Sequence, residues 1–156
     1  MRFPKFRSQT GDSVPGLAAK SIDVPSKSFT SARVLAESFG APVFEPTWWP
    51  EDAGTVLYEL DTWLSGAAYR IGSTRRGGTP ICVLGRPHDP GRNLPIGDWS
   101  PIPELEPVGG LISTRGANVR GVVHQEHQTI HLIGYASETE LLQAVKSFQR
   151  VPAASD

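Results

Sequence analysis

The sequence predicts an α+β fold: an antiparallel sheet of about five to seven strands, made of a meander and hairpins, with an N-terminal and a C-terminal helix packed on one face. Apolar residues recur at every second position in several segments after Thr55, and at helical spacing near each end of the chain. The 16 glycines and 14 prolines among 156 residues favour many short elements joined by turns.

The chain is long enough for one domain with a hydrophobic core, which we place at residues 28–151. Residues 1–27 are polar and contain three prolines without a sustained period, so we expect a disordered or loosely packed tail. Residues 152–156 form a short C-terminal tail.

The first expected helix is Ser28–Phe39, with Thr30 or Ser28 as its N-cap. Gly40 is placed to end it in the left-handed conformation. Pro46 and Pro50 then bound a rigid segment that we expect to be neither helix nor central strand.

Alternating apolar residues predict a strand from Thr55 to Leu64, with Glu59 and Asp61 on its solvated face. Strands at 67–72 and 81–84 complete a meander. Residues 85–107 contain six prolines and are interpreted as an insertion loop. Another strand is expected at Val108–Thr114.

A β-hairpin is expected at Val119–Glu126 and Thr129–Tyr135, with His127-Gln128 at its tip. This register places His124 opposite His131 and Val122 opposite Ile133. The other face carries Val123, Ile130 and Leu132 and is predicted to pack on the core.

The C-terminal helix begins after Ser137, because Ser137 and Glu140 form a capping box. Apolar residues at helical spacing extend its pattern to Phe148, and Pro152 stops it. We expect this helix to lie across the sheet.

From Pro42 to Val151 the chain resembles a family of uncharacterised bacterial domains, found as the C-terminal module of some anti-sigma-factor and sporulation-related proteins. The resemblance lies in the Pro46–Pro50 segment and in the hairpin leading into the Ser137–Phe148 helix. It implies an α+β fold related to lipoprotein-carrier and photosystem-accessory domains, a binding or sensing role, and no catalytic residues. The chain differs from the anchored members in having no membrane helix, and in carrying His124 and His131 where aromatic residues are expected.

Charge and cysteine content exclude several classes of function. The formal net charge is −1, which argues against nucleic acid and against an anionic membrane as partners. The single cysteine, Cys82, permits no intrachain disulfide; we interpret it as a buried apolar residue, with a reactive thiol as the alternative. No apolar run reaches the length of a membrane helix, and we expect a cytoplasmic protein.

Three histidines on the hairpin, His124, His127 and His131, are the candidate metal ligands, with zinc as the ion. Glu126 is a candidate fourth ligand. The competing interpretation is that these histidines are solvated or packed at a sheet edge.

The leading functional prediction is a non-enzymatic module that binds a small apolar ligand or a protein partner. The candidate ligand-binding residues are Trp48, Trp49 and Trp99, although one of the first two could instead close the core. A metal-binding protein or metal-dependent hydrolase that uses the hairpin histidines is the alternative. The arginines 70, 75 and 76 are interpreted as part of a mixed, soluble surface.

Overall fold

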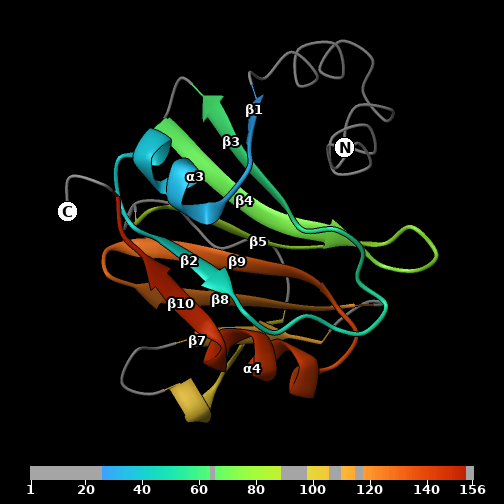
Figure 1. Cartoon of the computed structure of the whole chain (residues 1–156). Helices are drawn as coiled ribbons and strands as arrows, with labels where there is room; N and C mark the ends of the chain where they lie inside the picture. Colours follow the sequence, from blue (N-terminus) through green and yellow to red (C-terminus); the bar gives the residue numbers. More distant parts are fainter. Residues whose placement is uncertain (1–25, 64–65, 89–97, 106–109, 115–117, 154–156) are drawn as a thin grey trace, which may run out of the picture.

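The structure, a computed structural model, describes residues 26–63, 66–88, 98–105, 110–114 and 118–153 (Figure 1). In chain order the elements are β1 (Ser26–Phe29), α3 (Ala32–Phe39), β2 (Val43–Pro46), β3 (Leu57–Trp63), β4 (Gly66–Thr74), β5 (Pro80–Pro87), β6 (Ser100–Pro101), the 3-10 helix η1 (Pro103–Leu105), β7 (Gly110–Ser113), β8 (Val119–Gln125), β9 (Gln128–Tyr135), α4 (Glu138–Lys146) and β10 (Phe148–Val151).

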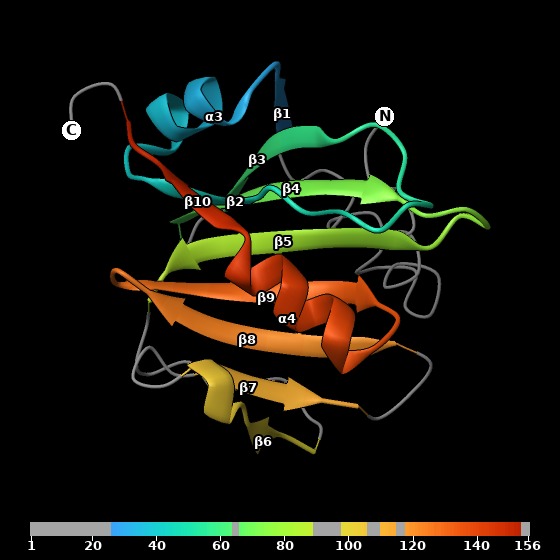
Figure 2. The same ribbon diagram turned by 60° about the horizontal axis from the view of Figure 1, so that its bottom comes forward.

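In the part of the chain that the structure describes, eight strands form one antiparallel sheet in the order β1-β3-β4-β5-β9-β8-β7-β6, and β2 pairs with β10 apart from it. The predicted α+β class is therefore confirmed, with more strands than expected. Figure 2 shows α3, α4 and the β2–β10 pair on the same face of the large sheet. Neither helix of the described residues is long and apolar enough to cross a membrane.

The core lies between this layer and the sheet. Leu35 of α3 and Leu141 of α4 are fully buried in one cluster with Ile130 and Leu132 of β9. Val123 joins the same cluster, which confirms the predicted apolar face of the hairpin. A Cβ atom at Gly121 would come within 2.8 Å of Leu141 Cδ1, so a glycine lets α4 approach β8 closely.

The first helix is shorter than predicted at its start. Ser31 is the N-cap, its hydroxyl accepting a hydrogen bond from Val34 N, whereas Ser28 and Thr30 were the expected caps. Residues 26–29 instead form β1 on the edge of the sheet beside β3, because tertiary pairing outweighs the local helical pattern. Strand β1 also takes up two residues of the predicted tail; residues 1–25 lie outside the described part. Gly40 ends α3 at φ 81°, as expected.

The C-terminal helix ends earlier than its apolar spacing indicates. Ser137 and Glu140 form the predicted capping box, with Ala136 N donating to Glu140 Oε1 at 2.9 Å. The helix stops at Lys146, because Phe148–Val151 pairs with Val43–Pro46 as an antiparallel ribbon. The predicted rigid segment Pro46–Pro50 therefore begins at the last residue of β2.

The face of the sheet opposite the helices differs most from expectation. Glu59 is fully buried and Asp61 is 4% exposed, although both were predicted to be solvated. Arg70, expected at the surface, is 1% exposed and forms an ion pair with Asp61. Glu59 stands directly opposite Arg70 in the β3–β4 register. These charged groups can be buried because the positive charge of Arg70 on β4 lies beside the carboxylates of Glu59 and Asp61 on β3.

Cys82 is buried on this second face, in agreement with its prediction as a buried apolar residue. Burial raises the pKa of its thiol to about 12, which keeps the group protonated and unreactive.

The predicted insertion is partly regular. Strand β5 continues to Pro87 instead of ending at Leu84, and β6 and η1 occupy residues 100–105. Residues 89–97 and 106–109 lie outside the described part of the chain.

Candidate functional site

The candidate site lies where β5 ends beside the turn of the β8–β9 hairpin. Gln125 pairs with Gln128 and His124 pairs with Thr129, so the two turn residues are Glu126 and His127. Both have positive φ, 41° and 66°. The predicted tip at His127-Gln128 is therefore wrong, and each cross-strand partner moves by two residues.

Gln128 was predicted to lie at the tip of the hairpin, but it is the first residue of β9 and is buried on the helix side of the sheet. Its Oε1 accepts a hydrogen bond from Tyr69 OH at 2.9 Å, and its Nε2 donates to Pro42 O at 2.5 Å. Tyr69 OH in turn accepts from Phe44 N at 3.1 Å. This buried network ties the hairpin turn to the segment that leads into β2.

His131 does not face His124, contrary to prediction. It pairs with Val122 on one side and with Leu84 on the other. Its Nε2 lies 3.3 Å from Arg86 Nη2. A guanidinium group can only donate, so Nε2 of His131 accepts this bond and the ring proton is on Nδ1. The lone pair on Nε2 of His131 is therefore used by Arg86 and does not face His124.

The histidine that does meet His124 is His88, which follows β5. The two ring centroids are 5.0 Å apart and the planes are nearly perpendicular, at 81°. The backbone N–H of His88 donates to His127 O at 2.7 Å, and its Nδ1 lies 2.9 Å from Thr129 Oγ1. The chain thus fixes His88 at two points beside the hairpin.

The neutral form of His124 is favoured in this position. Partial burial lowers the pKa of His124, and the neighbouring His88 lowers it further.

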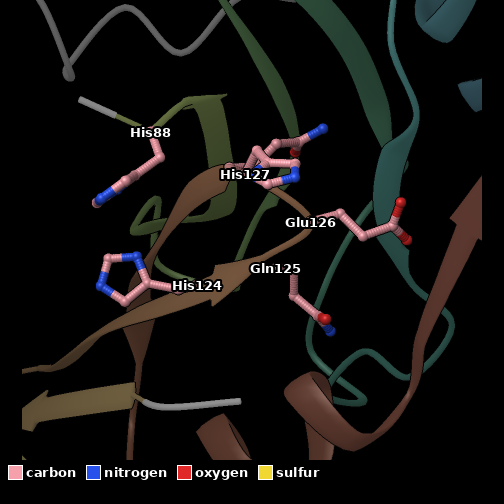
Figure 3. A pocket seen from close by; sticks show the side chains of 6 residues that line it. His88, His124, Gln125, Glu126 and His127 are labelled. Atoms are coloured by element: carbon pink, nitrogen blue, oxygen red, sulfur yellow. The ribbon is translucent and has the colours of Figure 1, made fainter. Parts of the chain in front are cut away.

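Glu126 and His127 point away from this pair (Figure 3). The carboxylate of Glu126 accepts a hydrogen bond from Arg150 Nε at 2.7 Å, so it does not stand beside His124 as the predicted fourth ligand. The three hairpin histidines are thus directed to three different places. Within the described ranges, no group of three or more His, Cys, Asp or Glu side chains is placed to hold a metal ion.

A pocket of about 480 Å³ opens at this end of the sheet. The described residues that line it all carry hydrogen-bonding side chains: His88, His124, Gln125, Glu126, His127 and Gln128. Figure 3 shows these side chains arranged around the hairpin turn. These described residues provide imidazole nitrogens, amide groups and the carboxylate of Glu126, which forms an ion pair with Arg150.

The three tryptophans predicted to bind ligand lie elsewhere. Trp48 and Trp49 follow β2 and pack, half-buried, against the core. The backbone N–H of Trp48 donates to Ser147 Oγ at 3.0 Å. Trp99 precedes β6 at the far edge of the sheet, where Arg120 lies 5.3 Å from its ring centroid. The structure does not gather the three into one site.

Sequence reasoning missed His88, because Pro87 and Pro90 mark a loop. The available signal was the pattern of β5: once the strand is continued to Pro87, its antiparallel pairing with β9 carries His88 to the hairpin turn.

Comparison of the chain with protein-family models, curated proteins and solved structures finds no match. The resemblance to the anti-sigma-factor and sporulation-related modules therefore stays a prediction.

Proposed function

We propose that this chain is a non-enzymatic binding module that receives a polar ligand in the pocket between His88 and the β8–β9 turn. The observation that carries the proposal is the lining of that pocket, in which every described side chain can form hydrogen bonds. Its volume of about 480 Å³ is in the range of small-molecule sites.

Buried neighbours hold two of the side chains that line the pocket, which favours ligand binding. Thr129, which contacts His88, and Gln128, which contacts Tyr69, are both less than a tenth exposed. Side chains held by buried partners lose little conformational entropy when a ligand arrives. The described residues that line the pocket include no serine, cysteine or lysine that could act as a nucleophile beside a histidine, so binding is better supported than covalent catalysis.

A polar ligand suits the structure better than the small apolar ligand expected from the sequence. The space between the sheet and the helix layer is filled by core side chains such as Tyr69, Ile130 and Leu141. The described pocket lies outside that core. A cytoplasmic location and an interaction with a protein partner stay predictions.

The test is two-dimensional NMR of 15N-labelled protein with a panel of polar fragments, comprising carboxylates, phosphates, sugars and amino acids. We expect shifts in the amides of Gln125 to Thr129 and in His88. Gln125→Ala should weaken binding, whereas Trp48→Phe should leave it unchanged. Shifts confined to the segment around Trp48 and Trp49, or no shift with any fragment, would contradict the proposal.

A further inference from the structure

We propose that His88 and His124 together bind one divalent transition-metal ion of the Zn²⁺, Cu²⁺ or Ni²⁺ class. The remaining coordination positions of the ion are left to water or to a donor atom of the bound ligand. This inference rests on the proposed function, because it states what the pocket holds.

The distance between the rings fits a shared ion. A tetrahedral ion with metal–nitrogen distances of about 2.0 Å places the centres of two imidazole ligands on the order of 5 Å apart. The centroids of His88 and His124 are separated by 5.0 Å. Their planes meet at 81°, so the rings are not stacked face to face. Face-to-face stacking would direct the nitrogens of both rings away from a common point.

Thr129 supplies the kind of support that metal-bound histidines have. Its Oγ1 lies 2.9 Å from His88 Nδ1, and the residue is 8% exposed. In the tautomer whose Nδ1–H donates to this oxygen, Nε2 of His88 carries the lone pair that binds a metal. Hydrogen bonding of the second nitrogen is how proteins fix the ring orientation of histidine ligands.

Both histidines are held by backbone and remain accessible. His124 belongs to β8 and pairs with Thr129, whereas His88 is tied to the turn through His127 O at 2.7 Å. Their side chains are exposed and line the pocket. An ion can therefore enter without rearrangement of the sheet.

The chemistry of the pair selects the class of ion. Neutral imidazole nitrogen is a good ligand for Zn²⁺, Cu²⁺ and Ni²⁺, whereas Ca²⁺ and Mg²⁺ prefer oxygen. Glu126, which would supply an oxygen, is paired with Arg150. His127 is directed away from the pair (Figure 3). The site thus has two protein ligands and open positions, which differs from the predicted trio of His124, His127 and His131.

The experiment is isothermal titration of untagged protein with Zn²⁺ and with Ni²⁺, in a buffer that does not chelate metals. We expect one ion per chain, and a loss of affinity of about tenfold or more in His88→Ala and in His124→Ala. Thr129→Val should weaken binding less, because it removes only the support of His88. His131→Gln is the matched control, since it replaces a histidine of the same hairpin that contacts Arg86 and lies outside the pocket lining, and it should bind as the parent does.

NMR separates a lost ligand from a misfolded variant. The imidazole carbon-bound protons of His88 and His124 should respond to Zn²⁺ in the parent, and each single variant should keep the amide spectrum of the folded chain. The proposal is overturned if the parent binds neither ion at millimolar concentration. It is also overturned if His131→Gln weakens binding as much as His88→Ala does.

The same samples distinguish failure of this inference from failure of the proposed function. Fragment-induced shifts at Gln125 to Thr129 without any metal binding would leave the binding pocket in place and reject the ion. Binding of Zn²⁺ by the histidine pair, with no fragment shift in its presence or absence, would reject the polar-ligand module and keep the metal site.

Discussion

Two buried tyrosines show how much one hydroxyl depends on its partners. Tyr69 OH donates to Gln128 Oε1 and accepts from Phe44 N. Tyr135 OH is also buried, but it has no hydrogen-bond partner within the described residues. Both side chains are fully buried, so they differ mainly in the hydrogen bonds that their hydroxyls form.

Tyr69→Phe should therefore destabilise the protein by about 1–3 kcal/mol, because it leaves two buried polar groups without a partner. Tyr135→Phe is the matched control and should be close to neutral or slightly stabilising, since it removes a buried hydroxyl that has lost its water. Urea unfolding of both variants measures the difference. Equal losses in the two variants would show that the Tyr69 network contributes nothing beyond packing.

The hairpin residues show what could be predicted and what could not. The apolar face, Val123, Ile130 and Leu132, follows from alternation alone, and a register shift by two residues leaves that face unchanged. The cross-strand partner of His124 does change with such a shift. It depends on the turn, where Glu126 and His127 adopt positive φ without the Asn-Gly signal that usually marks such a turn.

At the scale of elements, Arg75 joins three segments that are distant in sequence. It binds Asp52 through Nε and Nη2 at 3.1 and 2.9 Å, and Glu140 of α4 through Nη1 and Nη2 at 2.8 and 3.1 Å. Nη1 also donates to Gly134 O at 3.2 Å. One side chain thereby connects the β4–β5 turn, the β2–β3 connection and the start of α4.

Arg75→Met should lower the melting temperature at neutral pH by roughly 5 °C. The hydrogen bonds from Arg75 lower the pKa of both Asp52 and Glu140. A carboxyl whose pKa is lowered by folding stabilises the protein above its unfolded pKa, and this contribution is lost as the pH falls through the folded pKa. The difference between parent and variant should thus shrink below the usual carboxyl range of about pH 4.

Thermal scans of the two proteins across this pH range check the prediction. Arg33→Ala is the control, because its pair with Glu37 is exposed and measures 3.8 Å; such surface pairs contribute little. A difference between parent and Arg75→Met that stays constant down to acid pH would mean that Arg75 acts through packing and not through its carboxylates.

The end of α4 shows why element boundaries were harder to predict than element types. The capping box at Ser137 is a local signal and fixed the start of the helix in advance. The end depends on Ser147, whose Oγ accepts from Thr47 N and Trp48 N, both 3.0 Å away. Those partners are about a hundred residues earlier in the chain, so no local pattern indicates that Phe148 leaves the helix for a strand.

At the scale of the whole molecule, the large sheet carries buried side chains on both faces. One face holds the apolar core beneath α3 and α4. The other buries Glu59, Asp61, Arg70 and Cys82. Alternation in β3 predicted the strand and its apolar side, but it also predicted solvent on the charged side, because a single strand does not reveal that Arg70 stands opposite Glu59.

This charged cluster leads to the prediction for the fold as a whole. Arg70→Met should destabilise the protein by about 3–5 kcal/mol, since it leaves two buried carboxylates without the opposite charge that their strand neighbour supplied. Arg70→Lys keeps the positive charge and should lose less. The double variant Arg70→Met/Asp61→Leu should recover part of the loss of the single variant, because one of the uncompensated charges is gone.

Chemical unfolding of the three variants, followed by far-UV circular dichroism, supplies the measurement. The order of stability should be parent, Arg70→Lys and then Arg70→Met, with the double variant above Arg70→Met. If Arg70→Met is as mild as an exposed substitution, the face opposite the helices admits water in solution. In that case only the face of the sheet beneath the helices excludes water, and the burial of Arg70 and Asp61 does not contribute to the stability of the fold.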